Sequence, residues 1–145
     1  METGRKYRLG ASIVLLLFGV LLIGIVLGLS QETDMPNIKI QSPDDASAFL
    51  AELGWTADSS CAEIKETVLP EEFDDVLSEY NTLQLQQKLD LKRYVGKPVT
   101  IYTLPISNYK GTDNTVYATL IVHKHKVIAG DIHAAEINGF IHGLK

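Results

Sequence analysis

The strongest constraint on this chain is an uncharged apolar run of 21 residues, from Leu9 to Leu29. As an α-helix it is about 31 Å long, at about 1.5 Å per residue, which matches the hydrocarbon core of a bilayer. Ser12 is the only conventional polar side chain in the run. We therefore predict a transmembrane helix over residues 9–29.

Charges flank this run unevenly. The segment 1–8 carries one acid and three bases, whereas the residues just after the run are acidic: Arg5, Lys6 and Arg8 precede it, and Glu32 and Asp34 follow it. Basic flanks stay on the cytoplasmic side of a membrane. The expected protein is therefore single-pass in the cell membrane, with residues 1–8 in the cytoplasm and the C-terminal part outside.

The alternative for this segment is a signal peptide that is cleaved to release a secreted protein. Gly28 and Ser30 supply small residues at a spacing that suits cleavage. However, the apolar run is longer than the usual signal-peptide core of about 7–15 residues. Its length favours an uncleaved anchor in the lipid bilayer.

Gly24 and Gly28 form a small-xxx-small pair within the predicted membrane helix. Such a pair allows two helices to approach closely and would support a homodimer. Glycine is also common in membrane helices without any pairing role. Both readings of the pair stay open, and the second is the simpler one.

The rest of the chain is acidic. Of the whole chain's 13 Lys+Arg and 18 Asp+Glu, residues 1–30 hold 3 and 1, so residues 31–145 carry 10 and 17, a net charge of −7. This balance argues against nucleic acid as a partner, because nucleic-acid binding needs a basic face. One cysteine forms no internal disulfide and gives no zinc-site signature.

Residues 30–41 are polar and contain Pro36, which indicates a linker. Ser42 and Pro43 then suit the cap and first position of a helix, and Gly54 suits its C-terminal end. The apolar side chains between them recur at helical spacing. They are Ala46, Phe49, Leu50 and Leu53.

A short strand is expected over residues 62–69, with Ile64 and Val68 on one face. Pro70 ends this strand and opens a second helix, predicted to run to about Gln87 with acids in its first turn. Its apolar stripe is Phe73, Val76, Leu77, Tyr80 and Leu83. The two helices need a common surface to cover.

That surface is predicted to be a mainly antiparallel sheet of about four strands, and the fold class is α+β. Residues 99–107, 116–122 and 126–133 supply strands, and Lys124–His125 form the tip of a hairpin. Pro105 cannot donate to a ladder, so it suggests an edge strand or a bulge. The predicted extracytoplasmic domain spans residues 42–145.

Asp131 and His133 are the most informative polar pair. A two-residue turn at Lys124–His125 sets Asp131 opposite Ala118 and places the pair on an apolar face, where an acid needs a partner. The pair could perform acid–base chemistry or orient a ligand. Alternatively Asp131 has a structural role, accepting backbone hydrogen bonds where Gly130 bends the strand, and this is the favoured reading.

Catalytic and metal signatures are weak. His123 and His125 form an H-x-H pair, but it falls at the predicted hairpin tip between two lysines, so no metal site is assigned. Cys61 has no neighbour that would activate a thiol. No nucleophile-elbow, phosphate-loop or zinc-protease motif occurs. We therefore expect that the protein is not an enzyme, and we predict no cofactor.

Six segments resemble a bacterial family of small membrane-anchored extracytoplasmic proteins catalogued as a domain of unknown function. They are Leu53–Trp55, Glu79–Leu83, Tyr94–Pro98, Tyr102–Tyr109, Val127–Asp131 and Gly139–Leu144. The chain departs from the family pattern at Ala129, where a second glycine is usual, and at Lys124–His125, where a pair such as Asp–Gly is usual. The resemblance implies an α+β extracytoplasmic domain of unassigned activity. It also draws attention to the glycine-flanked Phe140–His142 segment.

The function expected from these features is a membrane-anchored interaction or sensing module with a protein partner outside the cytoplasm. The alternative is a small-ligand or metal-binding domain that uses Asp131, His133 and His142. A third reading, an envelope enzyme using Asp131 and His133, has no motif to support it.

Overall fold

A computed structural model describes residues 34–145, and residues 36–145 form one compact unit. The predicted membrane helix, with its boundaries Leu9 and Leu29 and the pair Gly24 and Gly28, lies outside the described residues. Within residues 34–145, no helix has the length and apolar character needed to cross a membrane.

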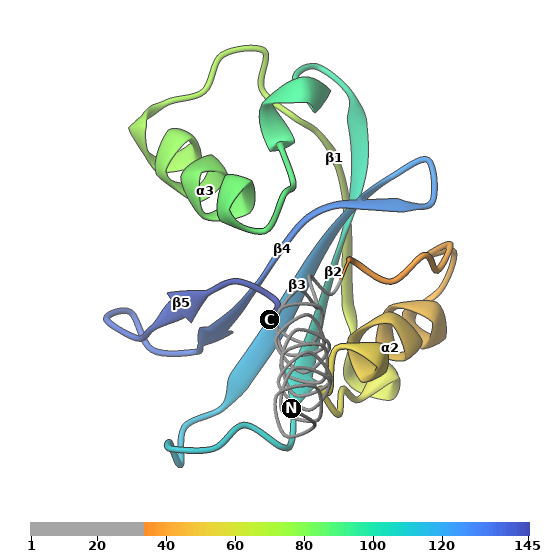
Figure 1. Cartoon of the computed structure of the whole chain (residues 1–145), viewed down its shortest axis with the longest axis vertical. Helices are drawn as coiled ribbons and strands as arrows, with labels where there is room; N and C mark the ends of the chain where they lie inside the picture. Colours follow the sequence, from red (N-terminus) through yellow and green to blue (C-terminus); the bar gives the residue numbers. More distant parts are fainter. Residues whose placement is uncertain (1–33) are drawn as a thin grey trace, which may run out of the picture. The chain divides into compact units, whose positions relative to one another are not determined.

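The unit is α+β, with one antiparallel sheet and two α-helices, as predicted (Figure 1). The sheet has five strands in the order β1-β2-β3-β4-β5, each antiparallel to its neighbour. The strands are β1 Glu63–Val68, β2 Pro98–Ile106, β3 Val116–His123, β4 Lys126–Ala134 and β5 Ile141–His142. The fifth strand, only two residues long, was not predicted.

Helix α2, Pro43–Glu52, begins and ends as the sequence predicts. The Ser42 hydroxyl accepts a hydrogen bond from the Asp45 backbone N–H, Pro43 occupies the first turn, and Gly54 follows the helix at φ +95°. Three residues of the predicted stripe are buried at 0–1% exposure: Ala46, Phe49 and Leu50. Leu53 is the C-cap instead of a stripe residue.

Helix α3, Asp75–Gln86, starts five residues later than predicted. The cap is Asp74, whose carboxylate accepts from the Leu77 backbone N–H, and not a residue near Pro70. The expected stripe is also wrong at Val76, which is 73% exposed. The buried face instead contains two amides, Asn81 and Gln84.

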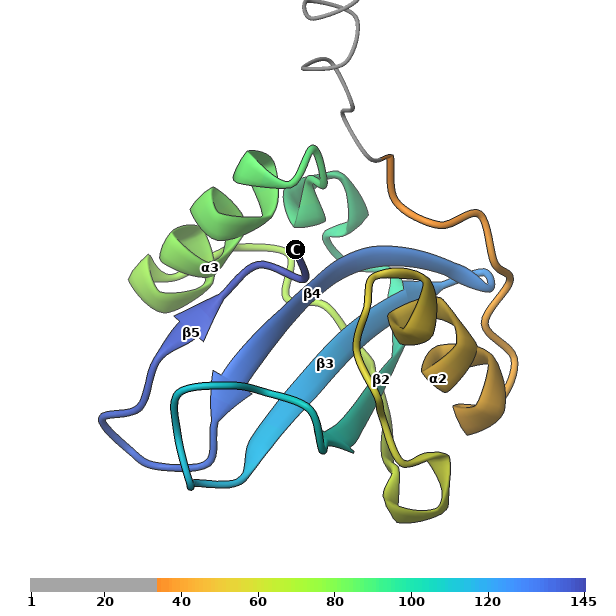
Figure 2. The ribbon, with the colours of Figure 1, turned by 60° about the horizontal axis from the view of Figure 1, so that its bottom comes forward.

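Both helices cover the sheet, as predicted, and they lie on opposite faces of it (Figures 1 and 2). The α2 face is apolar and closely covered. Its buried side chains come from three central strands and are Tyr102, Leu104, Val116, Ala118, Leu120 and Ile132. The tail residue Leu144 also packs here, because a Cβ on Gly130 would lie 2.7 Å from its Cδ1.

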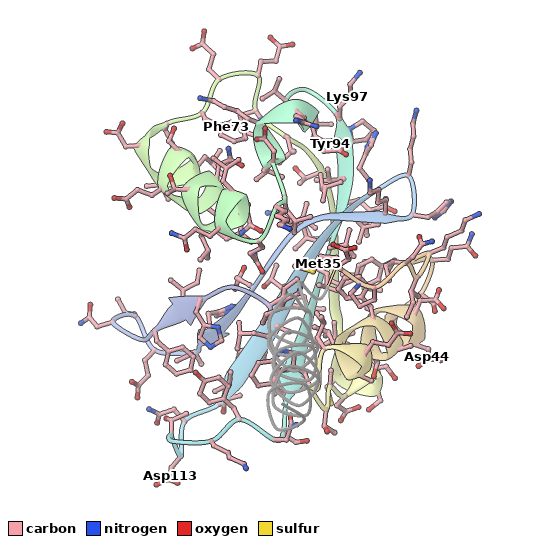
Figure 3. The ribbon with its side chains drawn as sticks, viewed as in Figure 1. Met35, Asp44, Phe73, Tyr94, Lys97 and Asp113 are labelled. Carbon is pink, nitrogen blue, oxygen red and sulfur yellow. The ribbon has the colours of Figure 1, made fainter. Side chains whose placement is uncertain are left out.

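The α3 face is only partly covered. Helix α3 and the short 3₁₀ helix η2, Leu91–Tyr94, lie over a cluster of six buried residues: Leu69, Leu91, Val99, Ile121, Ile128 and Ala129. Phe73 and Tyr94 pack at its margin (Figure 3). Farther along the same face, Thr103, Tyr117 and Thr119 stay partly exposed.

The predicted strand register is correct at the hairpin tip and wrong beyond it. His123 faces Lys126 and Val122 faces Val127, but a β-bulge next to this pair sets Ile121 opposite Ala129. The extra residue is Ile128, which reverses the facing of everything after it in β4. Asp131 therefore faces Thr119, not Ala118, and lies on the α3 face.

Pro105 lies in β2, which has strands on both sides, so the expected edge strand is also wrong. The proline is tolerated because β1 pairs with β2 only as far as Thr103. Beyond Thr103 no residue of β1 requires a backbone N–H from position 105. The Pro105 carbonyl accepts a hydrogen bond from the Asp58 backbone N–H.

The hairpin tip is held in a conformation that its residues disfavour. Lys124 and His125 have φ values of +47° and +67°. The segment before α2 stabilises the turn, because the Ile40 backbone N–H donates to the His125 carbonyl at 2.8 Å. Ile40 itself is 1% exposed, so this part of the expected linker belongs to the folded domain.

Candidate functional site

The Asp131 carboxylate has two side-chain partners. Its Oδ1 lies 2.7 Å from His133 Nδ1, and its Oδ2 accepts a hydrogen bond from the Tyr80 hydroxyl at 2.7 Å. Asp131 is 4% exposed, so both partners are needed to satisfy it. The acid thus finds its partner in side chains, and not in the backbone groups that the sequence suggested.

Local structure explains how these groups meet. Asp131 and His133 are two residues apart on β4 and share the face that the bulge at Ile128 turns toward α3. Tyr80 reaches the same point from the middle of α3. The ring of Tyr117, opposite His133 on β3, stacks on the imidazole at 5.9 Å.

The electrostatics fix the protonation of the tyrosine. Burial, and then the negative charge and hydrogen bond of Asp131, raise the pKa of Tyr80 well above its usual value of 10.0. Tyr80 therefore remains a neutral donor at physiological pH. The carboxylate accepts from both sides, which makes His133 Nδ1 the protonated nitrogen and leaves Nε2 as the outer end of the ring.

This arrangement has two chemical uses. A carboxylate that orients a histidine prepares the second ring nitrogen to accept a proton or bind a ligand. The His133 side chain is 30% exposed, so ligands can reach it. The same contacts also attach α3 to β4. Within residues 34–145, no group of three His, Cys, Asp or Glu side chains is placed to hold a metal ion.

His142 does not join this site. It pairs with Ile132 in β5, so it lies on the face opposite to His133. Its Nδ1 donates to the Gly143 carbonyl at 2.6 Å, and its Nε2 lies 2.9 Å from the Tyr109 hydroxyl. The three candidate residues therefore divide into two separate sites.

The surroundings of His142 form an aromatic cluster. Tyr109 stacks on Phe140 at 4.8 Å and on Trp55 at 5.6 Å, and Trp55 Nε1 donates to the Leu144 carbonyl at 2.7 Å. These contacts fix the C-terminal tail against the domain. They give His142 a structural role that sequence spacing did not reveal.

Two glutamines were missed by the sequence analysis: Gln84 in α3 and Gln87, the residue that caps its C-terminal end. Gly130 lies in β4 beyond the reach of the short β5, and its backbone N–H donates to Gln84 Oε1 at 2.9 Å. Its carbonyl accepts from Gln87 Nε2 at 2.9 Å. The Gln87 side chain also accepts from the Leu144 backbone N–H at 2.6 Å. The available signal was the spacing of Tyr80, Gln84 and Gln87, one polar group per helical turn.

A cavity of about 580 Å³ lies elsewhere, beside β1. Its floor is the α2 face at the start of β2 and the end of β3, including Tyr102 and Val122. Its walls come from β1, from Ile40 and Gln41, and from the hairpin tip at Lys124 and His125. His123 and His125 each place Nδ1 against a backbone carbonyl, that of Pro98 for His123 and that of Ile40 for His125.

The chain was compared with known proteins at three levels. No family model, curated protein or solved structure matches it.

Proposed function

We propose that this protein is a membrane-anchored extracytoplasmic module that acts by binding a protein partner, in an interaction or sensing role. The observation that carries the proposal is the cavity of about 580 Å³, which adjoins the unpaired edge of β1. Its lining mixes apolar side chains such as Ile40, Ile64 and Val122 with polar ones such as Glu66, Lys124 and His125, so it can offer both apolar contacts and hydrogen bonds to a partner. The resemblance to a family of small anchored proteins supports the anchored arrangement.

The anchoring part of the proposal rests on the apolar run of residues 9–29 and its basic flank. Full-length protein should stay in membranes washed with alkaline carbonate, and added protease should digest the C-terminal domain of spheroplasts. A mature protein whose mass lacks residues 1–30 would instead indicate cleavage and secretion. A dimer that is lost on replacing Gly24 and Gly28 by isoleucine would support helix pairing.

The binding part is tested by site-specific photo-crosslinking in living cells. A photoreactive residue replaces Ile64, which lines the cavity, or Val76, which is exposed on α3 as a matched control. One envelope protein captured from position 64 and absent from position 76 supports the proposal. Equal capture from both positions, or from neither, contradicts it.

A second candidate function is binding of a small ligand at His133, with an envelope enzyme as its catalytic variant. It is favoured by the hydrogen bond that fixes His133 Nδ1 and by the 30% exposure of the His133 side chain. Thermal unfolding is measured with simple metabolites and divalent ions. A shift seen in the wild type and absent in His133→Gln supports this candidate, and no shift in the wild type argues against it.

A further inference from the structure

Strand β1 forms one edge of the sheet, and within residues 34–145 no strand pairs with its outer side. Leu69, just after the strand, directs both its N–H and its carbonyl toward residues 96–97, which come just before β2. Backbone direction alternates along an antiparallel strand. Ile64, Glu66 and Val68 therefore direct their N–H and carbonyl groups outward, available to another strand.

The side chains of these three residues lie on the α2 face, since Ile64 pairs with Tyr102 and Glu66 with Thr100. Ile64 and Val68 are large apolar side chains that are 51% and 59% exposed. Glu66 lies between them. The outer edge of β1 thus presents an apolar, acidic, apolar series to an incoming strand.

The adjoining cavity has a negative end at β1. Ile64 and Glu66 form part of its lining, and Tyr102 lies on its floor. Burial, and then the negative charges of Asp45 and Glu66, raise the pKa of Tyr102. Of these two acids, Glu66 lines the cavity itself, and Lys124 and His125 of the hairpin tip also line it. A cationic side chain is best stabilised at the β1 end.

We propose that β1 receives an extended segment of a partner protein by antiparallel strand addition. The segment would place apolar side chains opposite Ile64 and Val68, and a Lys or Arg opposite Glu66 at the mouth of the cavity. Main-chain hydrogen bonds give such complexes affinity, and alternate side chains give them specificity. This inference rests on the proposed function, because it specifies the partner of the same site.

A second copy of the chain fits this edge less well than a basic partner. Antiparallel strands place residues of the same face opposite each other. Two symmetric antiparallel registers pair β1 with its copy along most of its length. One is centred on Lys65 and the other on Glu66, so in each register the central charged residue would face the same residue of the other copy. Like charges directly opposite are destabilising. Charged edge strands commonly avoid self-pairing in this way.

The test uses full-length protein in detergent micelles and a fluorescein-labelled synthetic peptide with the core Val-Thr-Lys-Thr-Val. Binding is followed by fluorescence anisotropy. Methylating the lysine backbone nitrogen removes a hydrogen bond to β1 and should weaken binding about tenfold or more. Methylating a neighbouring threonine nitrogen, which points away from β1, is the matched control and should change binding little.

Charge is tested in the protein itself. Glu66→Lys should weaken binding of the lysine peptide about tenfold, and a peptide with glutamate in that place should regain it. Glu63→Lys makes the same change in charge on the same strand but on the other face, so its effect should be small. Equal losses from both variants would show non-specific attraction and overturn the proposal, as would equal binding of the two methylated peptides.

The outcomes separate this inference from the proposed function. If the peptide does not bind at about 1 mM while crosslinking from position 64 still captures one partner, strand addition is wrong and partner binding stands. A concentration-dependent dimer of the wild type that Glu66→Lys changes and the peptide does not displace would identify a second copy as the occupant. That result would also overturn the proposal.

Discussion

The two faces of the sheet are covered in different ways. On the α2 face, apolar side chains such as Phe49, Leu104 and Leu120 are 0–1% exposed and make up the contact. On the α3 face, the helix contacts β4 partly through polar groups, with hydrogen bonds from Tyr80 to Asp131 and from Gln87 to Gly130. Apolar burial has no direction, whereas hydrogen bonds fix position and orientation.

The difference follows from the strands that each helix covers. Helix α2 covers central strands, whose backbone groups are already paired. Helix α3 lies beside β4, where β5 pairs only with Ile132 and His133 and leaves the backbone of Gly130 open. An unpaired edge needs donors and acceptors, and the amides of Gln84 in α3 and Gln87 at its C-terminal end supply them.

Removing an apolar side chain from the α2 face should have the largest effect. Phe49→Ala is expected to lower the free energy of unfolding by about 3–5 kcal/mol, because the cavity it leaves cannot close fully. Urea unfolding of full-length protein in detergent, followed by Trp55 fluorescence, measures the loss. Ala48→Gly, an exposed change on the same helix, should cost about 1 kcal/mol. Similar losses for both variants would contradict the picture of an apolar contact.

Adding a methyl group at Gly130, where Leu144 packs against β4, should lower the free energy of unfolding by about 3 kcal/mol. This value is the upper end of the usual range for overpacking. In Gly130→Ala the new Cβ would lie 2.7 Å from Leu144 Cδ1 and 2.8 Å from the Thr119 carbonyl oxygen. The double variant with Leu144→Ala removes only the first contact. The two losses should therefore be less than additive in urea unfolding, and full additivity would show that Leu144 does not set the clearance.

Removing the amide at the C-terminal end of α3 should lower the free energy of unfolding by about 2 kcal/mol. Gln87→Ala leaves the Gly130 carbonyl and the Leu144 N–H without their partners. Gln86→Ala, an exposed neighbour on the same helix, should change the free energy of unfolding by less than about 0.5 kcal/mol. If Gln87→Ala behaves like this control, the polar attachment of α3 is unimportant for stability.

The smallest expected effect, on the order of 1–2 kcal/mol at neutral pH, is that of Tyr80→Phe, which leaves Asp131 Oδ2 without its donor. The folded-state pKa of Tyr80 is raised by burial and by Asp131. Its contribution to stability is therefore full below the unfolded pKa of about 10 and is lost as pH rises toward the folded value.

Urea unfolding from pH 7 to pH 11 measures how the free energy of unfolding changes as Tyr80 ionises. Wild-type protein should lose stability more steeply than Tyr80→Phe above about pH 10, so the two curves should converge. Parallel curves would show that the Tyr80 hydroxyl is not held by Asp131 in solution. Absorbance at 295 nm should show one fewer high-pH tyrosine ionisation in the variant.

The sequence predicted those elements that local patterns determine. Ser42, Pro43 and Gly54 mark α2 because capping and left-handed conformation depend on adjacent residues. The strands around Lys124–His125 were likewise predicted from alternation and β-branched residues. The late start of α3 was missed because Pro70 and Asp74 both suit a helix start, and only the packing of Phe73 and Tyr80 decides between them.

The candidate site was predicted in part. Sequence spacing placed Asp131 and His133 on one face of β4, and the structure confirms their contact at 2.7 Å. Spacing could not show that Tyr80 completes the pair, because Tyr80 and Asp131 are 51 positions apart in the sequence. Nor could it show that His142 lies on the other face, because that depends on how β5 pairs with β4.

By itself, the sequence determined the α+β class, most strand positions and the capping of α2, because period, β-branching and turn chemistry act over a few residues. The tertiary structure alone decided which face each helix covers, that Ile128 forms a bulge, and that β1 remains an open edge beside a cavity. A bulge of one residue reverses every side chain that follows it. Its position depends on which register best buries both faces at once, which is a property of the assembled sheet and of no single segment.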